Sequence, residues 1–301
     1  MDTQTLKYIG KDLYKTHILK EWKRYIVFMT RCHLHKGQIN DLLDFFKATP
    51  QRQAMLEHTT SFVEQTTRAF FYKDSTWDER IAIVKNHIEY MENIFNDKAI
   101  AKLYVNGERI RLWEDVYEEQ PVVMELWFHG GQRKEGCLSL VLSLGEDELY
   151  QIMFWLAPSP EDNELSLWIG ALQGTPNGSE IIKGLTKAFF GYRTKNLIFY
   201  GIRNVAAGLG CKHLYAVSNA GYYAMNHVRR DRKLKTSLDD FWQECEGKVC
   251  KDQRFFEMPI EEYRKSMEEL KPSKRAQHRR RFAKMDEITE SVTEVLNNYK
   301  K

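Results

Sequence analysis

The hydrophobic pattern of this chain changes from helical to strand-like spacing near residue 102, and this change limits the fold more than any other feature. Before it, apolar residues recur at helical spacing. After it come four strand-like runs, at residues 122–128, 137–144, 149–156 and 165–173. The segments between them, such as GEDE and PSPEDNE, are rich in turn residues. The pattern predicts an antiparallel meander within an α+β fold.

The first hundred residues predict a helical region. Its clearest helix covers residues 77–95, where apolar residues recur every three or four positions. Ser75 or Thr76 can cap the start of this helix. We therefore place a helical N-terminal region at residues 1–101 and an α+β domain at residues 102–301.

A hairpin is predicted where the period changes. Residues 103–113 read LYVNGERIRLW, with Asn106 and Gly107 between two short apolar runs. An Asn-Gly pair supplies the positive φ angles that a tight hairpin turn requires.

The meander is followed by a helix, a second helix and another strand. The second helix ends near Gly208 and Gly210, because glycine commonly terminates helices. The next strand is expected at residues 213–218, and a short edge strand at 254–258. A long C-terminal helix is expected at residues 273–298.

A glycine-bearing loop after the last meander strand is the best candidate for a ligand site. Backbone N–H groups at the start of a helix favour negative charge. Gly174 and Gly178 would let the backbone approach the phosphates of a nucleotide or of coenzyme A, while Gln173 and Thr175 offer polar side chains. The alternative is an ordinary connection, since Pro-Asn-Gly is common in turns and the loop lacks both the P-loop and the GxGxxG pattern.

Two cations begin the second helix. Arg193 and Lys195 are positioned in the sequence to pair with the same phosphates. The alternative is a solvated helix face.

The sequence identifies no catalytic residue. Cys211 and His213 could form a nucleophile and a base, but no third group orients them, and a buried thiol is the simpler interpretation. Cys245 and Cys250 lack a matching second pair, so no metal site is expected. Carboxylates at residues 239–244 could serve as a general base, although Phe241 and Trp242 favour a packing role for that segment.

Two basic clusters are predicted to bind anions. The first reads HVRRDRKLK at residues 227–235, and the second lies in the first half of the C-terminal helix. The candidate anion-binding residues of the second cluster are Lys274, Arg275, Arg279, Arg280 and Arg281. They could meet anionic lipid head groups or RNA phosphates. The alternative is a solvated helix balanced by its acidic second half, and no motif for sequence-specific nucleic-acid binding is present.

Composition bears on the compartment. The net charge is only +3, so an anionic partner must be met by local patches. Five scattered cysteines without a CxxC pair are typical of a reducing cytosol. No signal peptide and no membrane-spanning run is found. We expect a cytoplasmic protein that can also lie peripherally at the inner membrane.

Residues 122–284 resemble the VirK/YbjX family of Gram-negative bacteria. The resemblance is carried by Leu172-Gln173-Gly174, by residues 215–218, 239–242 and 255–259, and by the basic run from Lys274 to Arg281. It is also carried by Gly191-Tyr192-Arg193-Thr194-Lys195, where the family commonly has proline at the position of Thr194. The resemblance implies a role in virulence, envelope stress or tolerance of antimicrobial peptides, and implies no catalytic residue.

The order of elements also resembles the GNAT acyltransferase fold, in which a meander, a loop, a helix and a further strand follow one another. That resemblance implies coenzyme A or acyl-coenzyme A bound at the loop after residue 173. The chain departs from the family's Gln/Arg-x-x-Gly-x-Gly/Ala spacing and carries an extra helix before Thr194.

Two functions follow as expectations. The first is an envelope-stress or virulence factor that acts as an acyl or aminoacyl transferase near the membrane. The second is a non-enzymatic protein that binds anionic lipid, RNA or a protein partner through its basic patches. The sequence defines neither the substrate nor the oligomeric state.

Overall fold

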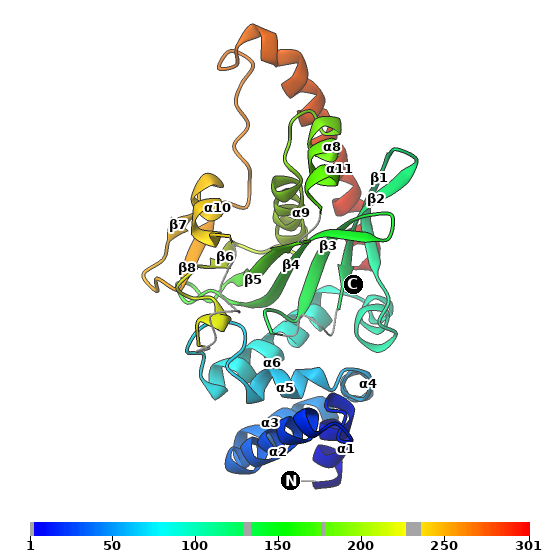
Figure 1. Ribbon diagram of the computed structural model, residues 1–301, viewed down its shortest axis with the longest axis vertical. Helices are drawn as coiled ribbons and strands as arrows, with labels where there is room; N and C mark the ends of the chain where they lie inside the picture. The colour runs from blue at the N-terminus through cyan, green and yellow to red at the C-terminus, as the bar shows by residue number, and fades with distance from the viewer. Residues whose placement is uncertain (1–2, 129–133, 176–177, 227–235) are drawn as a thin grey trace.

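The protein has an α+β fold in three layers, seen in a computed structural model that describes residues 3–128, 134–175, 178–226 and 236–301. A helical region covers one face of a central sheet, and α8, α9 and α11 lie on the other face (Figure 1). In the described residues, eight strands form one sheet in the order β1-β2-β3-β4-β5-β6-β8-β7. A single hydrophobic core joins the layers.

The helical region contains short helices that end in a π-helical turn. Their bounds are α1 (Thr3–Leu13), α2 (Leu19–Leu34), α3 (Lys36–Lys47), α4 (Pro50–His58), α5 (Ser61–Thr67), α6 (Trp77–Ile94), α7 (Asp97–Ile100) and η1 (Ala101–Val105). The predicted cap of α6 is confirmed. The Thr76 hydroxyl accepts from the backbone N–H of Glu79, and the Glu79 carboxylate accepts from the backbone of Thr76, which forms a capping box.

A buried histidine attaches α6 to the sheet. Nδ1 of His87 accepts from the backbone N–H of Leu156 at 3.0 Å, so Nε2 carries the proton and donates to the Tyr104 hydroxyl at 2.7 Å. Burial lowers the pKa of His87 to about 3, which keeps the ring neutral in this role.

The predicted antiparallel meander is confirmed. Its strands are β1 (Ile110–Tyr117), β2 (Gln120–Trp127), β3 (Leu138–Leu144), β4 (Asp147–Pro158) and β5 (Leu165–Gly174), each paired antiparallel with the next. The β1–β2 turn consists of Glu118 and Glu119, at φ 47° and 64°. This tight turn was not predicted, because glutamate seldom adopts positive φ.

The predicted hairpin at residues 103–113 is wrong. Leu103 and Tyr104 belong to η1, and only the later residues enter β1. Gly107 has a φ of 66° and ends the helical turn, where the N–H of Glu108 donates to the carbonyl of Lys102 at 2.8 Å. A glycine at positive φ serves a helix C-terminus as well as a hairpin, so the Asn-Gly pair did not distinguish the two.

The rest of the chain adds one parallel strand pair. Its elements are α8 (Ser179–Ala188), α9 (Thr194–Gly208), β6 (His213–Val217), η3 (Tyr223–Asn226), α10 (Leu238–Glu244), β7 (Lys248–Val249), β8 (Phe255–Met258) and α11 (Pro272–Tyr299). β6 pairs with β5 in parallel after the crossover through α8 and α9. The predicted edge strand at 254–258 is β8, which lies between β6 and β7 instead.

The long helix α11 has two different halves. Its C-terminal half buries Met285, Ile288, Val292 and Leu296 and contacts α9 and β1. The first turns of its N-terminal half extend beyond α8 (Figure 1), whereas Gln277 and Arg281 in this half donate to the carbonyl of Phe190.

Candidate functional site

The predicted glycine loop packs largely against its own chain. A side chain on Gly174 would meet the ring of Tyr150 at 2.8 Å, and one on Gly178 would meet the methyl group of Thr175 at 2.6 Å. The N–H of Thr175 donates to the carbonyl of Leu149. Residues 176 and 177 lie outside the described residues. Phosphate binding by this loop stays a prediction.

The two cations at the start of α9 turn toward α10. Arg193 forms an ion pair with Glu244, and the Lys195 ammonium lies 3.9 Å from the centre of the Phe241 ring. Between them, the Thr194 hydroxyl is buried and approaches Tyr150 without reaching hydrogen-bond geometry.

Cys211 and His213 do not form a nucleophile and base. Burial raises the pKa of Cys211 to about 12, so the thiol stays protonated at neutral pH. His213 is held between two carboxylates, with Nε2 at 2.9 Å from Asp162 and Nδ1 at 3.0 Å from Glu257. Its hydrogen bonds to Asp162 and then Glu257 raise its pKa despite partial burial.

The basic half of α11 contains both fixed and open cations. Arg281 donates to the carbonyl of Phe190 at 2.9 Å, and Arg275 donates to the carbonyl of Leu270. Among the residues that the structure describes, Lys274 reaches only Gln277. Two further residues, Arg279 and Arg280, are exposed and form no ion pair within the described part of the chain. The first basic cluster, at 227–235, lies outside the described residues.

The side chain of Gln173 contacts a buried carboxylate, that of Glu135, which the sequence did not indicate. Its side-chain N–H donates to Oε1 of Glu135 at 3.0 Å, and the Tyr222 hydroxyl donates to the same oxygen at 2.9 Å. Only 4% of Glu135 is exposed. In the described residues Oε2 receives no hydrogen bond, which leaves it free to accept a proton.

The environment of Glu135 disfavours the ionised form of its carboxyl group. Burial raises its pKa to about 7, and the hydrogen bond from Tyr222 only partly opposes this. Two other buried glutamates are neutralised by arginine: Glu64 by Arg68, and Glu125 by Arg109 and Arg111. Within the described chain Glu135 has no ion pair. A carboxyl group that titrates near neutrality is suited to general base catalysis.

A glycine in β5 makes room for Glu135. The β4–β5 register shifts at Gly170, and a side chain there would lie 1.8 Å from the carbonyl oxygen of Glu135. The pairing of β5 with β6 covers only the register from Ser166 to Ile169. The carboxyl half of β5, with Gln173, therefore runs past β6 beside Glu135.

An aromatic cleft of about 790 Å³ lies on the same face of the sheet, between α6 and strands β4, β5, β6 and β8. In-register pairing places Trp155, Trp168 and Tyr215 side by side across three strands. The rings of Trp168 and Tyr215 stack with centroids 4.2 Å apart. Nε1 of Trp168 is buried and has no hydrogen-bond partner in the described residues. Charged side chains also line the cleft, namely Glu79, Glu161, Lys251, Asp252 and Arg254. A cleft that combines an aromatic wall with polar groups is typical of small-molecule sites.

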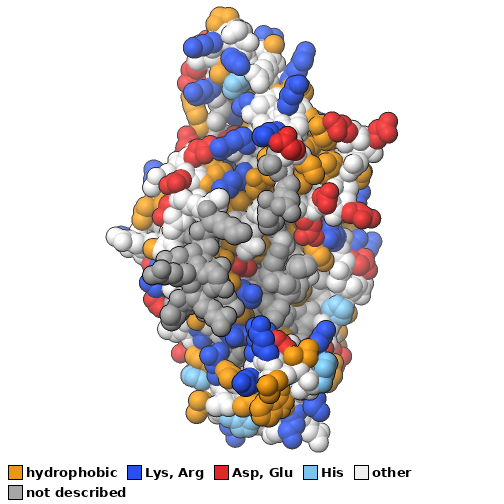
Figure 2. Space-filling view, in the orientation of Figure 1, with side chains coloured by type: hydrophobic (Ala, Val, Ile, Leu, Met, Phe, Trp, Pro, Cys, Tyr) orange, Lys and Arg blue, Asp and Glu red, His pale blue; other side chains and the backbone are white. Residues whose placement is uncertain are grey.

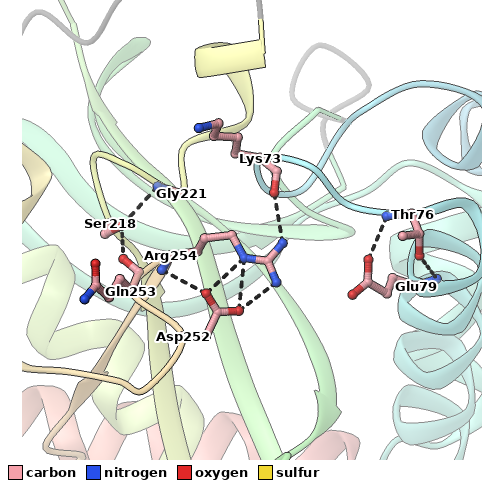
Figure 3. Close-up of polar contacts among 8 residues, drawn as sticks. All are labelled: Lys73, Thr76, Glu79, Ser218, Gly221, Asp252, Gln253 and Arg254. Atoms are coloured by element: carbon pink, nitrogen blue, oxygen red, sulfur yellow. Dashed lines mark hydrogen bonds and ion pairs between the residues drawn. The ribbon is translucent and has the colours of Figure 1, made fainter.

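Arg254 fixes the polar rim of this cleft. Its guanidinium donates to the Asp252 carboxylate at 2.7 Å and to the carbonyl of Lys73 at 3.1 Å (Figure 3). It also lies over the ring of Tyr72, 4.8 Å from the centroid. The capping residue Glu79 lines the cleft from α6.

The cleft and Glu135 share one wall. Trp155 lines the cleft, and its ring also reaches the space above Gly170 that the backbone of Glu135 occupies. Tyr72 lines the cleft as well, and its backbone bridges to Tyr222. The candidate site therefore consists of an aromatic cleft and, behind its Trp155 wall, the buried carboxyl group of Glu135, which does not itself line the cleft.

These features define an α+β protein with a mixed sheet, a buried glutamate and an adjacent aromatic cleft. The chain belongs to the family described as Protein of unknown function (DUF535), which matches residues 17–294. An uncharacterized protein of Haemophilus influenzae is 22% identical over 270 residues, 87% of each chain. The uncharacterized protein YbjX of Escherichia coli K12 is 29% identical over 195 residues, 62% of this chain and 57% of YbjX. The resemblance to the VirK/YbjX family is confirmed.

No solved structure matches the chain, so the comparisons leave the GNAT resemblance without support. None of the described helices has the length and apolar character needed to cross a membrane.

Proposed function

We propose that the protein is an acyltransferase in which Glu135 is the general base. The observation that carries the proposal is the position of this carboxyl group. It is buried beside the carboxyl half of β5 and held through Oε1 by Gln173 and Tyr222, and burial raises its pKa to about 7. The parallel β5–β6 pair that follows the meander adds the element order of GNAT-like enzymes as an analogy.

The chemistry requires one proton acceptor and one activated acyl group. An amine or hydroxyl group of the acceptor loses its proton to Oε2 of Glu135 as it attacks the acyl carbonyl carbon. The leaving thiol or alcohol departs with a proton, which returns the carboxylate to its starting state. The aromatic cleft is suited to an apolar acyl chain, and a coenzyme A thioester, whose activated acyl group would support the reaction, is the donor to test first.

The assay is release of free thiol from acyl-coenzyme A thioesters in the presence of a panel of amines and alcohols. Glu135→Gln should lower turnover about a hundredfold or more, because the amide cannot accept the proton. The rate should fall about tenfold per pH unit below the pKa of about 7, because the base is then protonated.

Two variants separate this role from stability. Tyr222→Phe removes a hydrogen bond to the carboxylate, so the pKa of Glu135 should rise and the acid limb of the rate profile should move to higher pH. Glu125→Gln, at a buried glutamate held by arginines, should retain activity. Turnover in Glu135→Gln equal to that of the parent would exclude the proposal.

In the cell, we propose action at the cytoplasmic face of the inner membrane in envelope stress, virulence or peptide tolerance. This rests on membership of the VirK/YbjX family and on the open cations of α11. A strain without the gene should become more sensitive to a cationic antimicrobial peptide, and Glu135→Gln should fail to restore resistance.

A second function, binding without catalysis, is favoured by one observation. Arg279 and Arg280 are exposed on the basic half of α11. Cations without acidic partners can bind anionic lipid or RNA. If no thioester is turned over and the intact protein still binds such anions, this second function is the better description.

A further inference from the structure

The strongest surface feature of the molecule is a group of large apolar side chains exposed on α1 and α2. Of the eleven exposed large hydrophobic side chains in the described residues, seven belong to this part of the chain. They are Tyr8, Ile18, Leu19, Trp22, Ile26, Val27 and Leu34. Leu19 is 69% exposed and Leu34 is 77% exposed.

The apolar residues form a stripe on one side of α2. Leu19, Trp22 and Ile26 are spaced three and four residues apart, so they share a face of the helix. The opposite side of α2 buries Phe28 and Cys32 in the core. The packing of α2 is therefore satisfied without the stripe.

Lysines surround this stripe. Residues 3–34 contain seven Lys and Arg against two Asp and Glu, a net of five positive charges. One of the two acids, Glu21, is paired with Arg24, and the other, Asp12, accepts from the Thr60 hydroxyl. The exposed lysines are Lys7, Lys11, Lys15, Lys20 and Lys23. Figure 2 shows exposed hydrophobic side chains among Lys and Arg at this end of the molecule.

We infer that the exposed face of α2 docks on the surface of an anionic lipid bilayer. A helix with an apolar face and flanking lysines lies in the membrane interface, with the apolar side chains inserted and the ammonium groups at the head groups. Each lysine near an anionic leaflet adds to the attraction. The surface supplies both parts of this pattern.

Charge and shape favour a bilayer over a second copy of the chain or a bound peptide. A symmetric dimer would bring the same patch of each copy together, and the uncompensated lysines would repel one another. Peptide partners insert an apolar helix or strand into a groove, whereas the stripe is the outer, convex side of a helix. A planar apolar layer below a negative surface matches both properties.

The experiment is co-sedimentation of the full chain with vesicles of phosphatidylcholine containing about a third phosphatidylglycerol. Trp22→Ser with Ile26→Ser should weaken binding about tenfold or more, because two large apolar side chains no longer enter the interface. Val116→Ser removes an exposed apolar side chain at a distant β-strand, 65% exposed, and should leave binding unchanged. All altered side chains are exposed, so the melting temperature should stay near that of the parent.

Three results would overturn the inference. The first is equal binding by the parent and by the Trp22 and Ile26 double variant. The second is equal binding of the parent to pure phosphatidylcholine vesicles, which would remove the role of the lysines. The third is a parent protein that sediments as a dimer while the double variant sediments as a monomer, which would assign the face to a second copy of the chain.

Discussion

The two ends of the molecule are both basic, but they are built differently. The N-terminal half of α11 lies at one end of the longest axis, and α1 and α2 lie at the other (Figure 1). The open cations of α11, Arg279 and Arg280, have few large apolar neighbours in sequence. The lysines of α2 flank an exposed apolar stripe.

The difference shows that net positive charge alone does not define a partner. A charged helix without apolar side chains attracts any dense anion, and salt screens that attraction. An apolar stripe with flanking cations adds a hydrophobic contribution to the binding free energy, which salt does not screen. We therefore expect the two ends to respond differently to substitution and to ionic strength.

The largest effect should come from charge reversal on α11. In the background of Trp22→Ser and Ile26→Ser, Arg279→Glu with Arg280→Glu should weaken binding to anionic vesicles about thirtyfold. The loss of the two cations alone, at about 1 kcal/mol each, corresponds to this factor, and the two added carboxylates act in the same direction. Vesicle co-sedimentation at low salt measures it.

A charge-matched control is Lys212→Glu with Lys248→Glu. These two exposed lysines lie outside both ends, and the net charge changes by the same amount. If this pair weakens binding as much as the α11 pair, total charge and not the position of α11 determines binding.

An intermediate effect is expected from salt. Raising the ionic strength from about 0.01 M to about 0.15 M shortens the Debye length from about 30 Å to about 8 Å. Binding through α11 should then fall about tenfold, and binding through α2 by about threefold or less. Vesicle binding is measured against salt concentration for the α2 double variant and for the α11 double variant. Equal salt dependence of the two would contradict the expected difference between the two ends.

The smallest effect distinguishes two neighbouring arginines within α11. Arg281→Ala removes a hydrogen bond to the carbonyl of Phe190 and should lower the free energy of unfolding by about 1 kcal/mol. Arg280→Ala should change it by less than about 0.5 kcal/mol, because that side chain is exposed. Urea unfolding measures both, and equal values would show that Arg281 has no structural role.

The sequence predicts the elements whose signals are local. The cap at Thr76, the helix after it and the meander each depend on residues close together in the chain, and the structure confirms them. The predicted hairpin at 103–113 is wrong because the pair Asn106 and Gly107 fits both a hairpin turn and the C-terminus of a helix. The real tight turn uses Glu118 and Glu119, which carry no turn signal.

The candidate site was only partly predictable. Gln173 was chosen for its place after a strand, but its partner Glu135 lies 38 residues away in a segment that reads as a turn, and Tyr222 lies 87 residues from Glu135. The cleft had one signal, the aromatic residues Trp155, Trp168 and Tyr215 on strand-like runs, yet only strand register brings them together.

The exposure of the apolar stripe on α2 could not be predicted from the sequence, for a different reason. Apolar residues occur on both sides of this helix, and a sequence does not show which side faces the core. Phe28 and Cys32 are buried, whereas Leu19 and Trp22 are exposed.

The docking of α11 has a consequence for how the chain is assembled. The Ser291 hydroxyl donates to the carbonyl of Leu112, 179 residues away, and the backbone N–H of Asn96 donates to the carbonyl of Tyr299. The C-terminal half of α11 thus packs as a ligand would against α9 and β1, held by buried side chains and hydrogen bonds rather than by its immediate neighbours in sequence. Fragment complementation follows from this arrangement. A separate α11 peptide should bind to a chain cleaved between β8 and α11, with an affinity set by the apolar surface that the peptide buries.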